Sequence, residues 1–151
     1  MYIMDDGIRL NAKLDMPENH GEKCPLVIVI HGFTGHMEER HIVAVSQTLN
    51  SIGYATLRVD MYGHGHSDGK FEDHTLYKWL TNALTVIDYA WNLDFVTDLY
   101  LCGHSQGGLT VMLAAAMKRE CEQFFHSRWY GVLTGVDPDY ILDRIREEEA
   151  A

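Results

Sequence analysis

A serine between two glycines stands where a strand should end and a helix begin. The segment Gly103-His104-Ser105-Gln106-Gly107 follows the apolar run 99–102 and precedes a helix-prone stretch, 109–117. In this context a G-x-S-x-G segment predicts a nucleophile elbow, a sharp turn that points the serine hydroxyl outward at the carboxyl edge of a sheet. We therefore predict that Ser105 is a catalytic nucleophile and that the Gln106 backbone N–H binds the oxyanion of an acyl-transfer intermediate. The alternative is a glycine and serine turn without chemistry.

A second glycine-rich segment, His31-Gly32-Phe33-Thr34-Gly35, follows another apolar run. Loops at this position of a hydrolase sheet donate a second N–H to the oxyanion, which predicts that role for the Phe33 amide. The Phe33 ring would cover an apolar or aromatic acyl group. We predict that His31, Gly32 and His104 line the substrate pocket. The alternative is a glycine-rich turn that carries a core phenylalanine.

The segments around these turns alternate between strand and helix patterns. Residues 26–30 are apolar at every position and rich in β-branched side chains, which is typical of a strand covered on both faces. Alternating residues around the turn Asp5-Asp6-Gly7 predict a hairpin, helical spacing predicts helices over 38–52 and 76–91, and strands are expected at 54–59 and 99–102. This order predicts an α/β fold with a mostly parallel sheet, helices on both faces and ligand sites at the carboxyl ends of the strands.

The predicted helix 76–91 carries a stripe of large apolar side chains. Its members recur every three or four residues and are Leu76, Trp79, Leu80, Ala83, Leu84, Ile87, Ala90 and Trp91. Such spacing indicates one helix face packed against the core, so we interpret the aromatic residues as core packing and not as a ligand site.

Composition and charge narrow the classes of partner. The 151 residues carry a formal net charge of -10, which argues against a nucleic-acid surface because phosphate binding needs clustered cations. The start of the chain lacks a basic and apolar leader pattern, and no apolar run approaches the ~20 residues that span a bilayer. Three cysteines without a C-x-x-C pair, Cys24, Cys102 and Cys121, are interpreted as reduced thiols of a cytoplasmic protein.

Three motifs in order carry a family resemblance: 31–35, the loop Arg58-Val59-Asp60-Met61-Tyr62-Gly63-His64-Gly65-His66-Ser67, and 103–108. Together they resemble bacterial α/β-hydrolase esterases, most of all the cinnamoyl (feruloyl) esterases, over residue 1 to about residue 118. The resemblance implies the N-terminal half of an α/β-hydrolase domain, Ser105 as the acylated nucleophile and hydroxycinnamate esters as the substrate class. It implies no cofactor.

The resemblance stops before the acid and histidine that such esterases carry on late loops. Residues 119–151 are predicted to be a divergent tail, helical or strand and helix. His126 is the only histidine after Ser105, and a continuous helix would carry it ~30 Å away, so we interpret it as a surface or interface residue. Asp137, before Pro138, is better explained as a helix cap than as a catalytic acid.

Three further interpretations stay open at this point. His64 and His66 form a His-x-His pair, but the absence of matching ligands predicts no metal site, and the loop is expected to pack beneath the active site. The strand at 99–102 would form an apolar sheet edge, which predicts a homodimer unless the tail covers it. The rivals to an esterase with impaired turnover are a non-catalytic interaction module and a hydrolase completed by a second polypeptide.

Overall fold

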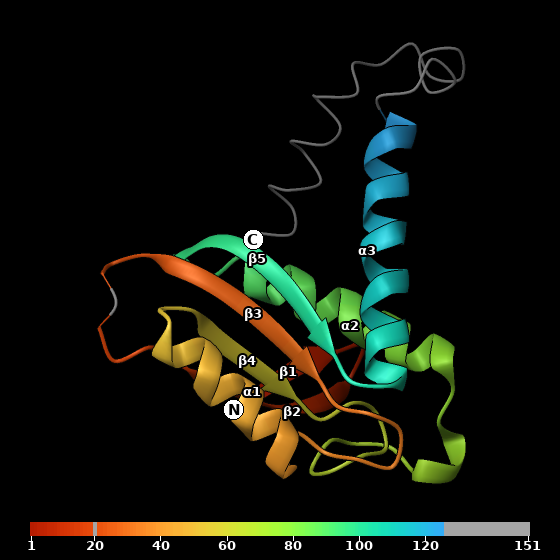
Figure 1. Ribbon diagram of the computed structural model, residues 1–151. Helices are drawn as coiled ribbons and strands as arrows, with labels where there is room; N and C mark the ends of the chain where they lie inside the picture. The colour runs from red at the N-terminus through yellow and green to blue at the C-terminus, as the bar shows by residue number, and fades with distance from the viewer. Residues whose placement is uncertain (20, 126–151) are drawn as a thin grey trace. The chain divides into compact units, whose positions relative to one another are not determined.

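A mixed sheet of five strands forms the centre of the first part of the chain (Figure 1). The computed structural model describes residues 1–19 and 21–125, with side chains as far as residue 119, and the chain divides into two units, Met1–Met112 and Leu113–Ala151. In spatial order β1-β2-β4-β3-β5, the strands are β1 (Tyr2–Asp5), β2 (Ile8–Asp15), β4 (Ala55–Val59), β3 (Cys24–Ile30) and β5 (Val96–Gly103). The last three are parallel and the first two form the antiparallel hairpin. The predicted α/β class is confirmed.

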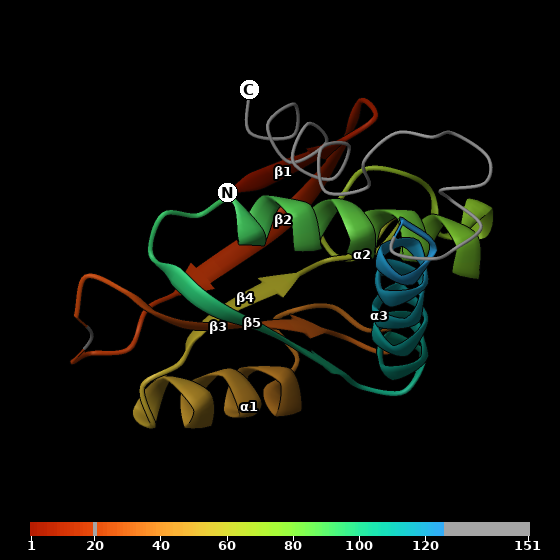
Figure 2. The same ribbon diagram turned by 90° about the horizontal axis from the view of Figure 1, so that it is seen from above.

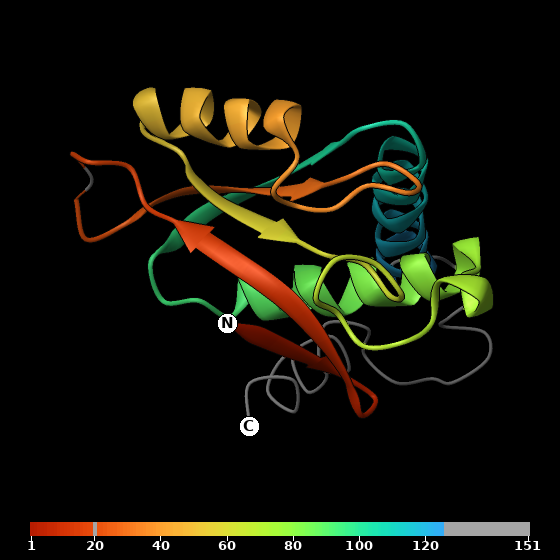
Figure 3. The same cartoon turned by 90° about the horizontal axis from the view of Figure 1, so that it is seen from below.

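Helices cover both faces of this sheet, as predicted. Figures 2 and 3 show α1 (Arg40–Ser51) on one face and α2 (Leu76–Trp91) on the other. On the α1 face, Val27 and Val29 of β3 pack with Ile42. On β3 the intervening side chains, including the fully buried Ile28, face the other way. The continuous apolar run of β3 therefore follows from burial on both of its sides.

The buried face of α2 differs from the predicted stripe. Trp79, Ala83, Ile87 and Ala90 are buried as expected, but Leu76 and Trp91 are exposed at the helix ends, and Leu80 and Leu84 are half-buried. Asn82 and Val86 are buried instead. The polar Asn82 is accepted there because its side chain accepts a hydrogen bond from the Tyr62 N–H and donates to Asp5. The apolar spacing correctly predicts the helix. The side of the helix that faces the sheet also depends on the hydrogen bonds of Asn82, which the spacing does not show.

The strand and helix that flank Ser105 are longer than the sequence pattern indicates. β5 begins at Val96 because its backbone pairs with β3 as far back as Cys24, while Thr97 and Asp98 are exposed on the solvent side. The following helix, α3 (Gln106–Phe125), begins immediately after Ser105. Within the described residues β5 pairs with β3 alone, and Tyr100 on it is 48% exposed. The homodimer through this edge stays a prediction.

The remaining expectations about the tail fall on residues that are not described. His126, Asp137 and the rest of the predicted tail after residue 125 lie outside the described residues. The predicted boundary near residue 118 falls within α3 and stays a prediction. None of the described helices is long and apolar enough to cross a membrane.

Candidate active site

Ser105 occupies a sharp turn between β5 and α3. It is one of three non-glycine residues with a positive φ in the described part of the chain, at 52°, and its side chain is exposed. An L-residue in this region of backbone space is strained, so surrounding contacts must hold it there. The turn closes through the Gly107 N–H, which donates to the His104 carbonyl at 2.9 Å, and the Leu109 N–H, which donates to the Ser105 carbonyl at 3.2 Å.

The two glycines that flank the serine permit this turn by removing side chains. A Cβ on Gly103 would lie 2.3 Å from the carbonyl carbon of Gly107, and a Cβ on Gly107 would lie 2.4 Å from the carbonyl oxygen of His31. Both contacts are with backbone, which has little freedom to yield. Close packing against backbone therefore requires glycine at both positions.

The loop that follows β3 lies directly against the serine turn. A Cβ on Gly32 would lie 3.4 Å from the Ser105 Cβ and 2.9 Å from the His104 Nδ1. The loop turns through a hydrogen bond from the Gly35 N–H to the Gly32 carbonyl at 3.1 Å. The structure therefore brings together Gly32, His104 and Ser105, three of the predicted site residues, while Phe33 next to them is 46% exposed.

The backbone amides of Phe33 and Gln106 directly follow, in the chain, the two residues that are in contact, Gly32 and Ser105. Within the described residues neither N–H donates a hydrogen bond to another group of the chain. A free N–H at the first residue of a helix is one of the groups that binds anions, because the helix dipole adds to it. The Gln106 carbonyl is held by the Thr110 hydroxyl at 2.9 Å.

His31 lies under the loop and not in an open pocket. It is fully buried; its Nδ1–H donates to the Gly32 carbonyl at 2.7 Å, and its Nε2 accepts from the Met61 N–H at 3.0 Å. Burial lowers the pKa of His31 from its ordinary value near 6.5, although the hydrogen bond to the Gly32 carbonyl acts in the opposite direction. The neutral ring thus fixes the carbonyl orientation of Gly32. Its predicted contact with substrate stays a prediction, and this burial does not favour it.

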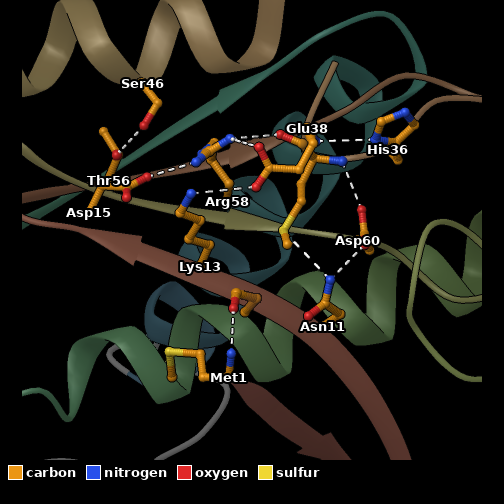
Figure 4. Close-up of polar contacts among 12 residues, drawn as sticks. Met1, Asn11, Lys13, Asp15, His36, Glu38, Ser46, Thr56, Arg58 and Asp60 are labelled. Atoms are coloured by element: carbon orange, nitrogen blue, oxygen red, sulfur yellow. Dashed lines mark hydrogen bonds and ion pairs between the residues drawn. The ribbon is translucent and has the colours of Figure 1, made fainter. Parts of the chain in front are cut away.

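Asp60, at the carboxyl end of β4, ties the neighbouring loops together (Figure 4). Its Oδ1 accepts from the Met37 N–H at 2.7 Å, and its Oδ2 accepts from the Asn11 amide at 2.9 Å and the His66 N–H at 3.0 Å. Gly65 is required beside it, since a Cβ there would lie 2.1 Å from Oδ2. The buried carboxylate therefore fixes both loops that follow β3 and β4.

Aromatic and histidine rings gather beside the loop after β3, and we name them the ring cluster: Phe33, His64, Phe71, His74 and Trp79. Phe71 belongs to the short helix η1 (Phe71–Asp73), and His74 follows it. His64 is buried against Phe33 and Trp79, so its loop packs beneath Phe33. Phe71 and His74 carry no periodic signal in the sequence that would identify them.

Two polar atoms of the ring cluster are buried without partners among the residues that the structure describes. They are the Nε2 of His64 and the Nδ1 of His74. In the described residues no group of three or more His, Cys, Asp or Glu side chains is placed to hold a metal ion. Buried unsatisfied nitrogens cost free energy, so they mark a place where folding alone does not explain the side chains.

The described residues place no base beside the serine. No hydrogen bond joins Ser105 Oγ to an imidazole within residues 1–19 and 21–125. His104 packs on His41, with ring centroids 4.5 Å apart, and is exposed. The described residues therefore supply an exposed serine hydroxyl and two backbone N–H groups without partners. They do not supply a general base for the serine.

The two described cysteines are free thiols. Cys24 is buried and Cys102 is half-buried, and burial raises the pKa of Cys102. A thiol with a raised pKa is a poor nucleophile, so Cys102 does not compete with the serine as the reactive group.

Comparisons with known proteins agree with this geometry. The family described as "Serine aminopeptidase, S33" matches residues 21–127. The structure of Est1E from Butyrivibrio proteoclasticus with ferulic acid bound is 77% identical, with a TM-score of 0.77, and the match covers 80% of this chain and 48% of that one. The structure of mouse alpha/beta hydrolase domain-containing protein 10 is 29% identical, with a TM-score of 0.62, over 80% of this chain and 44% of that one.

The curated relatives include a human enzyme named as the mitochondrial palmitoyl-protein thioesterase ABHD10. It is 34% identical over 98 residues, which are 65% of this chain and 31% of that protein. The chain thus spans about a third of the length of such relatives and about half of the solved structures that it matches.

Proposed function

The chain belongs to the serine aminopeptidase S33 family of hydrolases, and on that premise we propose that it is a serine carboxylic-ester hydrolase acting through an acyl-Ser105 intermediate. The likeness to a structure that holds ferulic acid supports small hydroxycinnamate esters as the substrate class. The likeness to a thioesterase supports the broader statement that an acyl group is transferred to the serine.

The proposed reaction uses the serine and the two free amides. Ser105 Oγ attacks the carbonyl carbon of the ester, the ester C–O bond breaks, and the alcohol leaves with a proton. Water then attacks the acyl-serine and releases the acid. Negative charge on the carbonyl oxygen in both transition states is stabilised by the N–H groups of Phe33 and Gln106, since fixed donors in this role commonly supply a large part of the rate.

The observation that carries this proposal is the strained, exposed backbone of Ser105 beside Gly32. A serine in an ordinary turn would not be kept at a positive φ by glycines that pack against backbone on both sides. Strain of this kind concentrates at functional sites. We therefore take the turn as the feature that presents the nucleophile.

We propose that turnover by the 151 residues alone is weak. A hydroxyl near its ordinary pKa needs a neighbouring base, and none is placed at Ser105 within the described residues. Without the base, binding and oxyanion stabilisation retain only part of the catalysis. Acylation by an activated reagent depends less on a base and should proceed.

A fluorophosphonate labelling experiment tests the proposal. Ser105 Oγ displaces fluoride from phosphorus, so the P–F bond breaks, an O–P bond forms and the hydroxyl proton is released to water. We expect one adduct per chain by intact mass, located on Ser105 by peptide mapping and absent from Ser105→Ala. Ser51→Ala, which changes another serine on an exposed helix end, is the matched control and should label like the wild type.

The absence of a base beside Ser105 among the described residues favours a second candidate, a non-catalytic module that retains the turn as structure. In that case the wild type would show no adduct under conditions that label a reference esterase. A third arrangement, in which a second polypeptide supplies acid and base, predicts labelling together with ester turnover that rises when a C-terminal hydrolase fragment is added.

A further inference from the structure

His74 contacts both residues whose amides are proposed to hold the oxyanion. The Gln106 side-chain Nε2–H donates to the His74 Nε2 at 2.8 Å, and the ring centroids of His74 and Phe33 are 5.1 Å apart. His74 lies between η1 and α2, 32 residues before Gln106 in the chain. A single side chain therefore connects the loop after β3 with the first residue of α3.

We propose that His74 is a positioning residue of the oxyanion hole, which holds the Gln106 side chain by a hydrogen bond and the Phe33 loop by ring packing. This inference rests on the proposed function. A catalytic amide that is displaced by a fraction of an ångström loses much of its effect, so the residues that support it contribute to rate without touching the substrate.

The hydrogen-bond pattern defines the state of the His74 ring. Because the Gln106 amide group donates, the His74 Nε2 accepts and its proton resides on Nδ1, so the ring is neutral. Burial lowers the pKa of His74, and His64 nearby acts in the same direction. The acceptor at Nε2 is thus present at neutral pH.

The unpaired Nδ1 argues that His74 is not retained for stability. Its N–H is buried without a partner within the described residues, and such a group costs free energy that an apolar ring would avoid. A phenylalanine would keep the contacts with Phe33 and Trp79. What it would lose is the acceptor for Gln106, which is the interaction that the proposal assigns to catalysis.

Gln106 is held at both of its ends by these contacts. Its carbonyl accepts from the Thr110 hydroxyl at 2.9 Å, and its side chain is tied to His74. The peptide between Ser105 and Gln106, which carries the proposed oxyanion donor, is restrained on one side by the hydrogen bond from the Leu109 N–H to the Ser105 carbonyl at 3.2 Å and on the other by the held Gln106 residue. Loss of the His74 contact should loosen the second of these restraints while the fold stays intact.

The first test is His74→Phe, with His66→Phe as the matched control. His66 is an exposed histidine of the preceding loop whose ring has no contact among the described residues. We expect the second-order rate of Ser105 labelling by a fluorophosphonate to fall about 10- to 100-fold in H74F, less than the 100- to 1000-fold typical of losing a whole donor. H66F should label within twofold of the wild type.

A steady-state measurement separates positioning from a general structural loss. With an activated aryl ester, H74F should lower the acylation rate at saturating ester and leave the half-saturating concentration within about twofold, because the oxyanion contact strengthens only in the transition state. Far-ultraviolet circular dichroism and thermal unfolding identify a variant that has lost its fold.

A double-mutant cycle tests the route of the effect. Gln106→Ala keeps the backbone N–H and removes the side chain that His74 holds. If His74 acts through Gln106, H74F should cost no more than about threefold in the Q106A background, whereas independent effects would multiply. Q106A also breaks the same hydrogen bond from a half-buried position, so it keeps the test valid if H74F unfolds.

The outcomes distinguish failure of this inference from failure of the proposed function. If the wild type is not labelled at Ser105, the proposed function is wrong and His74 has no oxyanion to serve. If the wild type is labelled and both H74F and Q106A label at the same rate, the function stands and the inference is overturned. Long-range ¹H–¹⁵N spectra should show an unprotonated His74 Nε2 that shifts in Q106A, and a protonated Nε2 would also overturn it.

Discussion

Two groups of residues near Ser105 contain buried polar atoms, and they differ in how completely those atoms are hydrogen-bonded. The first, which we name the floor, consists of His31 and Asp60, whose ring nitrogens and carboxylate oxygens all have partners. The second is the ring cluster, in which His64 and His74 each keep one buried nitrogen unpaired. Fully paired groups stabilise a fold, whereas unpaired ones are tolerated where another function requires them.

This difference assigns different tasks to neighbouring histidines. The floor fixes backbone: His31 holds Gly32 and Met61, and Asp60 holds Met37 and His66. The ring cluster holds side chains around the proposed oxyanion hole. Substitutions in the floor should therefore lower stability, and substitution of His74 in the ring cluster should lower rate with a small effect on stability.

The strongest test of this contrast is His31→Ala. Removal of the ring leaves the Met61 N–H buried without a partner, takes one of two donors from the Gly32 carbonyl and opens a cavity beside Trp79. We expect the free energy of unfolding to fall by about 3 to 5 kcal/mol, measured by urea denaturation. His66→Ala should change it by less than about 0.5 kcal/mol, as is usual for surface sites. A loss below about 1 kcal/mol for H31A would contradict the role of the floor.

The next largest effect is expected for Gly107→Ala, which tests the contact between the floor and the serine turn. The new methyl group would lie 2.4 Å from the His31 carbonyl oxygen and 2.5 Å from that of Ile30, so backbone must move. We expect a loss of about 3 kcal/mol in unfolding free energy, at the upper end for overpacking. Gly21→Ala, whose new methyl group would lie 3.9 Å from the Lys23 carbonyl oxygen, is the control and should be near neutral. Equal stability of the two variants would contradict the packing.

The pH dependence of stability provides a third test of the floor. Burial lowers the pKa of His31 below its ordinary value of 6.5, so the unfolded chain binds more protons than the folded one as the pH falls. Stability from this group is complete above about pH 6.5 and is lost below it, by at most about 1.4 kcal/mol per pH unit. The midpoint of urea unfolding should be constant from pH 8 to 7 and fall toward pH 5.

The titration of one carboxylate affects stability at a lower pH than the titration of His31. The Asp68 pKa is lowered by its hydrogen bond with Arg9, so that contribution is present above about pH 4 and is lost only below it. In ¹H spectra the His31 ring should stay neutral to a pH below its ordinary pKa of 6.5. A His31 ring that protonates with an ordinary midpoint, or stability that does not change down to pH 5, would show that the ring is not held neutral by burial.

The parts of the fold that could be predicted from sequence are those set by local pattern. The run 26–30 is apolar throughout and forms β3, and the turn at Asp5-Asp6-Gly7 joins β1 and β2. The glycines around Ser105 reflect a close approach of backbone that a Cβ would prevent, so the turn could also be identified. Each of these signals lies within a few residues of the feature that it predicts.

The parts that could not be predicted depend on contacts between distant segments. The pairing of His31 with Met61 and of His74 with Gln106 joins residues 30 and 32 positions apart, and no periodicity encodes it. The orientation of α2 is similar, because the partners of Asn82 come from β1 and the loop after β4. Side-chain pairing of this kind becomes visible only when the fold has brought the segments together.

The smallest expected effect concerns the strain at Ser105, which lies between the floor and the ring cluster. At φ 52° an alanine keeps the strain, whereas a glycine relieves it. We expect Ser105→Gly to exceed Ser105→Ala by about 1 kcal/mol in unfolding free energy, the usual cost of a left-handed L-residue. At Ser51, on the exposed end of α1, glycine should instead be the less stable of the two by about 1 kcal/mol. The same order at both positions would mean that Ser105 is unstrained, and the main structural argument for a presented nucleophile would then be lost.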